Sequence, residues 1–135
     1  MRRLKQILLV AVVLAALTAC VPPAPQVTSK VSCAGTPVEG AIRTAFAGTG
    51  DEVWALAVAA RESGCNPCAY YPSRSDCTSG GINPRSAKGL FQLVNHDDLI
   101  LAACPALYVA WNNPVCGAWA ARYLYEGSGR RPWGG

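Results

Sequence analysis

The sequence is organised around residues 49–64, which read TGDEVWALAVAARESG. Thr49 followed three residues later by Glu52 is a capping box, which predicts the start of a helix. Gly64 suits the left-handed cap that ends a helix, so we expect the helix to end at about Ser63. Its middle, residues 53–60, is apolar on every side. A helix without a polar face belongs in the core of a domain.

Glu62 is a carboxylate at the C-terminal end of this apolar helix. Trp54, Val58 and Glu62 are spaced four residues apart, so Glu62 ends a hydrophobic stripe. Apolar surroundings disfavour the charged form of a carboxylate, and so does the negative end of a helix. Glu62 is therefore a candidate general acid. The alternative is a solvated carboxylate, paired with Arg61 or Arg85.

A second motif, residues 86–92, reads SAKGLFQ and follows a loop rich in Cys, Pro, Ser and Gly. Together with Glu62-Ser63 and Asn66-Pro67, this motif resembles the soluble lytic transglycosylase family. The resemblance extends over residues 50–125. It implies a mainly α domain (α+β, lysozyme-like), in which a long disulfide-stapled loop surrounds a buried central helix.

The resemblance also implies roles for single residues. Glu62 would be the catalytic acid, and Ser63 would contact the substrate beside it. Gln92 would hydrogen-bond the N-acetyl group of a sugar. Phe91 stands at a methionine position of the family, where core packing is the alternative to substrate contact. Gly89 would permit close approach of another backbone.

Four aromatic residues are candidates for contacts with sugar rings. Tyr70 and Tyr71 could line a groove, and packing against the Cys-rich loop is their alternative. The family often ends with an Ala-Tyr-Asn segment, which this sequence lacks. Tyr123 or Trp133 could substitute for that tyrosine, and a frayed tail is the alternative for Trp133.

Three further helices are expected around the central one. Residues 38–47 have apolar residues at helical spacing. His96 begins a short helix through Ala103 and is expected to be a surface or capping group. Asn113-Pro114 has the residue types preferred at the start of a helix, and that helix should run to about Glu126.

Six cysteines besides Cys20 indicate a disulfide framework, because even numbers of cysteines in small exported domains usually pair. They are Cys33, Cys65, Cys68, Cys77, Cys104 and Cys116. Six cysteines allow 15 pairings. We expect Cys104 to pair with Cys116, because they flank one connection between helices. Zinc binding and redox activity at Cys65-Asn66-Pro67-Cys68 are the alternatives.

The N-terminal residues have the pattern of a bacterial lipoprotein signal. Arg2, Arg3 and Lys5 precede an apolar run that ends in Leu17-Thr18-Ala19-Cys20. An apolar run of this length is shorter than a membrane-spanning helix. We expect residues 1–19 to be removed, Cys20 to carry lipid, residues 20–37 to form a Pro-rich linker, and residues 38–135 to form the domain. An ordinary secretory signal is the alternative.

The charge of the mature chain is close to neutral. Removal of residues 1–19 takes away three of the 12 basic residues and none of the eight acids. Nine basic and eight acidic residues remain, which gives no basic patch for nucleic acid. The expected partners are peptidoglycan and, through the lipid on Cys20, a bacterial membrane whose outer side faces the cell wall or periplasm. No cofactor or metal is expected, and the protein should be a monomer.

The expected function is cleavage of peptidoglycan between N-acetylmuramic acid and N-acetylglucosamine, which leaves 1,6-anhydro ends. Glycosidases that use water or a covalent intermediate typically need two carboxylates. Asp76, Asp97 and Asp98 have no match in the family as a second catalytic acid, so a lytic transglycosylase with one acid is favoured. A hydrolytic lysozyme on the same fold and an inactive wall-binding lipoprotein are the alternatives.

Lipidation gives the first prediction. Expressed in a bacterial host, the mature protein should begin at Cys20 and partition into detergent, because acyl chains anchor a protein to membranes. The Cys20→Ser variant should remain in the aqueous phase. Mass spectrometry of the N-terminal peptide checks this. Soluble wild-type protein that starts beyond Cys20 would contradict it.

Overall fold

A computed structural model describes residues 31–71, 77, 85–105 and 110–135 of the chain. This part is a mainly helical compact domain with four α-helices, as predicted. The helices are α2 (Glu39–Phe46), α3 (Glu52–Ser63), α4 (Asp97–Ala103) and α5 (Pro114–Ser128), with two short 3₁₀ helices, η1 (Ala110–Asn112) and η2 (Arg131–Trp133). The described residues contain no β-strand, and their β-type pairing is limited to two isolated bridges, Tyr70 with Lys88 and Lys88 with Leu93.

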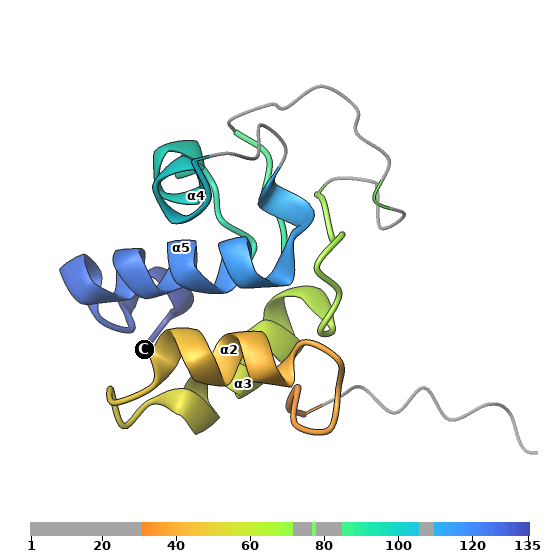
Figure 1. Cartoon of the computed structure of the whole chain (residues 1–135), viewed down its shortest axis with the longest axis vertical. Coiled ribbons are helices and arrows are strands. Elements are labelled where there is room, and N and C mark those ends of the chain that lie inside the picture. Colours follow the sequence, from red (N-terminus) through yellow and green to blue (C-terminus); the bar gives the residue numbers. More distant parts are fainter. Residues whose placement is uncertain (1–30, 72–76, 78–84, 106–109) are drawn as a thin grey trace, which may run out of the picture.

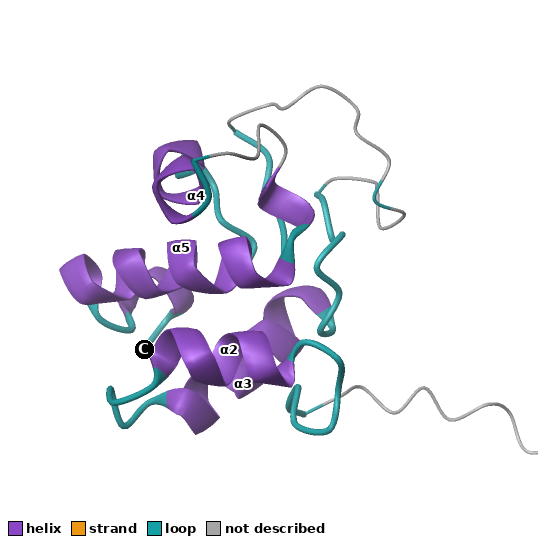
Figure 2. Ribbon diagram, in the orientation of Figure 1, coloured by secondary structure: helices purple, strands orange, loops and turns teal. Residues whose placement is uncertain are grey.

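Helix α5 is the middle layer of the domain (Figures 1 and 2). It packs against α2 on one side and against α4 on the other, and α2 in turn packs against α3. The buried face of α5 consists mostly of Ala and Gly, so its neighbours can approach closely. After α5, η2 returns to pack against the end of the same helix.

Helix α3 starts later than the capping box predicts. Its N-cap is Asp51, so the prediction of Thr49 as N-cap is wrong. The Thr49 hydroxyl instead bridges the connection between the helices: it donates to the carbonyl of Phe46 at 2.7 Å and accepts from the N–H of Asp51 at 2.9 Å. Glu52 does reach back, and its carboxylate accepts from the backbone N–H of Gly48 at 3.1 Å. At the other end, Gly64 has the expected left-handed conformation, with φ of 62°.

Two further expectations about the helices need correction. Val53 on α3 is exposed, so this helix is not buried on every side. Helix α5 continues through Gly127 to Ser128 and is capped by Gly129. Its start agrees with the prediction: the side chain of Asn113 accepts from two backbone N–H groups, and Pro114 is the first helical residue.

The core is centred on a cluster of five aromatic rings, which are those of Phe46, Trp54, Phe91, Tyr125 and Trp133. Phe46 of α2 lies between Phe91 and Tyr125, with ring centroids 5.8 and 5.5 Å away. Trp133 of η2 packs against Trp54 and Phe91 at 5.7 and 5.9 Å. The cluster therefore joins α2, α3, α5, η2 and the turn that contains Phe91.

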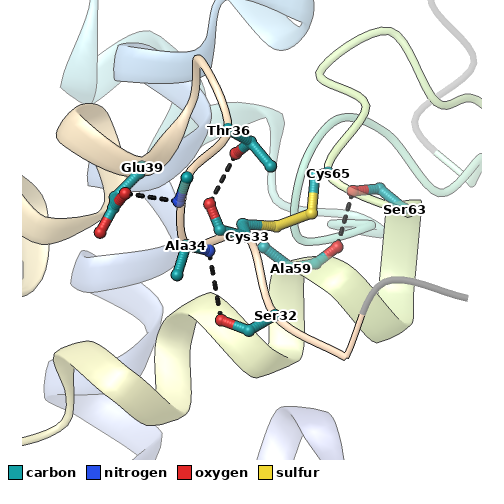
Figure 3. Close-up of a disulfide and its surroundings, with 9 residues drawn as sticks. Ser32, Cys33, Ala34, Thr36, Glu39, Ala59, Ser63 and Cys65 are labelled. Carbon is teal, nitrogen blue, oxygen red and sulfur yellow. Dashed lines mark hydrogen bonds between the residues drawn. A yellow bond between two sulfur atoms is a disulfide. The ribbon is translucent and has the colours of Figure 1, made fainter.

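Three disulfides close the described chain: Cys33–Cys65, Cys68–Cys77 and Cys104–Cys116. The predicted pairing of Cys104 with Cys116 is confirmed. Cys65 and Cys68 form bridges to different partners, so the C-x-x-C pair does not form a disulfide of its own. In Figure 3 the disulfide between Cys33 and Cys65 joins the segment before α2 to the end of α3. Cys33 is fully buried, so its bridge to Cys65 attaches the later part of the predicted linker to the folded domain.

Disulfides in this number are typical of proteins in an oxidising, extracytoplasmic environment. None of the helices in residues 31–71, 85–105 and 110–135 is both long and apolar enough to cross a bilayer. Cys20 lies outside the described residues, as does the rest of the predicted signal.

The bridge Cys33–Cys65 should contribute more stability than Cys104–Cys116. The two bridges span 32 and 12 residues. The chain-entropy relation predicts a loss of about 4 kcal/mol without the first bridge and about 3 kcal/mol without the second. Denaturant unfolding of Cys33→Ser/Cys65→Ser and Cys104→Ser/Cys116→Ser double variants measures the difference. An inverted order would contradict the entropic account.

Candidate active site

Glu62 lies in the last turn of α3 with its side chain 28% exposed. Nε and one terminal nitrogen of Arg61 donate to Oε1 at 3.0 and 2.8 Å. Within the described part of the chain, Oε2 accepts no hydrogen bond. The carboxylate thus has the Arg61 partner named as the alternative, and also an oxygen that is available to a ligand.

Arg61 is held by a second residue far away in sequence. The nitrogen that donates to Glu62 also donates to the main-chain carbonyl of Trp133 at 2.6 Å. The indole N–H of Trp133 in turn donates to the carbonyl of Phe91 at 3.0 Å. Hydrogen bonds therefore connect Glu62, through Arg61 and Trp133, to the residue before Gln92.

Gln92 lies in a tight turn and has a positive φ of 50°. Its side-chain amide donates to the carbonyls of Gly89 and Ala69, at 3.0 and 3.1 Å. These bonds use the nitrogen of the amide and leave the oxygen as the group that could accept from a ligand. The expected role of Gln92 toward an N-acetyl group remains a prediction.

A short connection links α3 to this turn. The side chain of Asn66 accepts from the N–H of Cys68 at 2.9 Å, which bends the chain after the helix. Ala69 then accepts from the N–H of Gly89 at 2.8 Å, and Tyr71 donates to Ala87 at 3.0 Å. The Glu62 and Gln92 motifs are therefore brought together through residues 64–71.

Lys88 is a buried cation that the sequence analysis did not identify. Its side chain is 0% exposed, and its ammonium group lies 2.6 Å from the carboxylate of Asp97. Asp97 is the first residue of α4, where a helix favours negative charge. This ion pair attaches the SAKGLFQ segment to α4 and gives Asp97 a structural role.

The aromatic candidates for sugar contacts differ in their exposure. Tyr71 is exposed, Tyr70 is half-buried with its ring 5.4 Å from Trp111, and Tyr123 is partly exposed beside Trp119. Phe91 is 1% exposed, so its assignment to substrate contact is wrong and its core alternative is correct.

Two other predicted site residues have internal partners. Trp133 is 7% exposed and packs within the core, so neither a frayed tail nor an open stacking surface describes it. The hydroxyl of Ser63 donates back to the carbonyl of Ala59 at 2.9 Å (Figure 3). His96 precedes α4 without a side-chain capping bond. Asp76 lies outside the described residues.

An open groove of about 560 Å³ lies along one face of α3. It is lined by Val31 and by residues of α3 between Trp54 and Gly64, most of them apolar. Arg61 lines this groove and also contacts Glu62. The groove therefore opens next to the ion pair.

No protein family, curated protein or solved structure matches this chain. The assignment of the site accordingly depends on its own geometry and on the sequence motifs. Lys88 and the contacts of Trp133 are the features that sequence reasoning missed. The adjacency of Arg61 and Glu62 was the local signal for their ion pair.

Gly89 tests the geometry of the turn. Its φ is +72°, and an added Cβ would lie 2.6 Å from the carbonyl oxygen of Trp111. Gly89→Ala should therefore destabilise the protein by about 2 kcal/mol or more, from left-handed strain and overpacking together. Thermal or denaturant unfolding measures this.

Gly40→Ala is the matched control. Gly40 lies in α2 with no atom within 4 Å of an added Cβ. Alanine should stabilise this position by roughly 0.5–1 kcal/mol. Equal changes in stability from the two substitutions would contradict the close contact between Gly89 and the carbonyl of Trp111.

Proposed function

We propose that this protein cleaves peptidoglycan glycan strands as a lytic transglycosylase with Glu62 as its single acid. The observation that carries the proposal is the position of Glu62: it ends an apolar helix, keeps Oε2 without a partner in the described part, and is connected to the Gln92 turn by hydrogen bonds. The resemblance of both motifs to the lytic transglycosylase family supports the same assignment.

The reaction needs no second carboxylate. Protonated Glu62 donates its proton to the glycosidic oxygen as the bond to the anomeric carbon breaks. The N-acetyl group of the muramic acid, oriented by Gln92, stabilises the positive charge at that carbon. Ionised Glu62 then accepts the proton of the 6-hydroxyl, whose oxygen bonds to the anomeric carbon to form the 1,6-anhydro sugar. One residue thus acts as general acid and then as general base.

The proposed location is the outer side of a bacterial membrane. The three disulfides support an oxidising compartment, and the lipoprotein pattern at Cys20 supports anchoring there. A lipid on Cys20 would keep the domain close to the cell wall, which is the substrate we propose.

An inactive wall-binding protein is the second candidate, and one observation favours it. The guanidinium of Arg61 donates two hydrogen bonds to Glu62. These bonds engage Oε1 and hold the carboxylate beside Arg61. If the pair keeps the carboxylate out of reach of the glycosidic oxygen when glycan is bound, the protein binds the wall without cleaving it.

Replacement of Glu62 by Gln tests the proposal. Glu62→Gln keeps the shape of the side chain and removes proton transfer, so activity should fall by roughly 10²-fold or more. Mass spectrometry of digested cell wall measures the activity and identifies the products. Anhydro ends are expected from the wild type, and new reducing ends would instead identify a hydrolase.

Glu126→Gln is the matched control, because Glu126 is an exposed residue of α5 that pairs only with Arg122 in the described part. It should retain full activity. Asp97→Asn is unsuitable, since it would leave Lys88 as a buried charge without this counterion. Full activity of Glu62→Gln would refute the assignment of the acid, and a wild type that binds wall without cleaving it would favour the second candidate.

A further inference from the structure

Trp133 contacts both halves of the candidate site by different groups. Its backbone carbonyl accepts from Arg61 at 2.6 Å, and Arg61 donates to Glu62. Its indole N–H donates to the carbonyl of Phe91 at 3.0 Å. These bonds span 72 and 42 residues of sequence, so η2 connects two segments that lie far from it in the chain.

On the Glu62 side, the bond to Trp133 restricts the guanidinium. An ion pair between neighbouring exposed residues is weak and its side chains are free to move, and the Arg61 side chain is 57% exposed. A third hydrogen bond to a carbonyl in a buried residue limits the positions that the guanidinium can take. Oε1 of Glu62 is then held by Arg61, and Oε2 takes no part in the bonds to Arg61.

On the Gln92 side, Trp133 fixes a peptide group. The peptide between Phe91 and Gln92 has its carbonyl bonded to the Trp133 indole, and its N–H donates to Gly89 at 3.2 Å. The orientation of this peptide sets the φ of Gln92, which is +50°. Non-glycine residues rarely adopt such a φ, so surrounding contacts must maintain it.

We infer that Trp133 is a positioning residue. It holds the Gln92 side chain at a fixed position relative to Glu62 and does not itself contact the substrate. This inference rests on the function proposed above. The ring of Trp133 is buried against Trp54 and Phe91, so η2 can move only if the core opens. Through Trp133, η2 thereby keeps the Glu62 and Gln92 motifs in fixed positions relative to each other.

The test uses Trp133→Phe, because Trp133→Ala would remove a buried ring and could prevent folding. Trp133→Phe keeps an aromatic ring in the core and removes the N–H bonded to Phe91. At saturating soluble glycan, its rate of product formation should fall about tenfold or more, because small misplacements of a catalytic group are costly. KM should change much less than kcat, because the proposed contact of Gln92 acts on charge that develops as the glycosidic bond breaks.

A double-mutant cycle distinguishes positioning from loss of stability. Gln92→Ala removes the side chain through which Trp133 is inferred to act. The double variant Trp133→Phe/Gln92→Ala should then be as active as Gln92→Ala alone, within about twofold. Rate losses that multiply would overturn the inference, because independent sites are additive in free energy.

NMR provides a readout that does not depend on catalysis. The backbone and side-chain amide signals of Gln92, assigned with Gln92→Ala, should shift in Trp133→Phe. They should not shift in Trp119→Phe, a matched change on α5 at a tryptophan whose ring packs against Tyr123. Unchanged Gln92 signals in Trp133→Phe would overturn the inference. If the wild type cleaves no glycan, the proposed function fails, and these signals alone decide whether Trp133 positions Gln92.

Discussion

The aromatic cluster around Phe46 is the interaction on which the other elements depend. The inner faces of α3 and α5 bury mainly alanine: six of their ten buried residues are alanines. Alanine lets helices approach closely but buries little apolar area, whereas each aromatic ring buries about 150–250 Å². The rings therefore supply much of the hydrophobic stabilisation. Since Phe91 and Trp133 are members of the cluster, the same contacts that stabilise the core also support the candidate site.

Features that depend on residues close together in the sequence could be predicted, and features that depend on distant residues could not. Gly64, Asn113 and Pro114 determine helix ends through bonds to residues within a few positions, so the sequence pattern was sufficient. Thr49 was misassigned because its hydroxyl could serve either of two adjacent helices, and local pattern does not decide between them. The pairing of Cys33 with Cys65 could not be chosen from 15 alternatives, because it depends on how residues 31–37 fold back onto α3.

The candidate site shows the same limit. Glu62, Gln92 and the close approach at Gly89 belong to short motifs, and these could be singled out in advance. The indole bond of Trp133 and the burial of Lys88 depend on tertiary packing. Lysine is rarely buried, so no pattern within SAKGLFQ pointed to the Asp97 partner on α4.

A third polar contact is equally remote in sequence: Asp51, before α3, bonds to Tyr125 and Arg130. Hydrogen bonds from Arg130 and Tyr125 lower the pKa of Asp51, so this contact stabilises the fold at neutral pH, and the contribution is lost as the pH falls through that lowered pKa.

The order of the disulfides has a consequence for how the chain matures. Each bridge joins a cysteine to the next one in the described sequence, 33 with 65, 68 with 77, and 104 with 116. A chain that enters an oxidising compartment from its N-terminus exposes these thiols one after another, and domains generally fold in that direction during synthesis. Each pair can then oxidise as soon as its second cysteine arrives, before any later cysteine is present. Oxidation in that order gives these three bridges directly, without rearrangement of mispaired bonds.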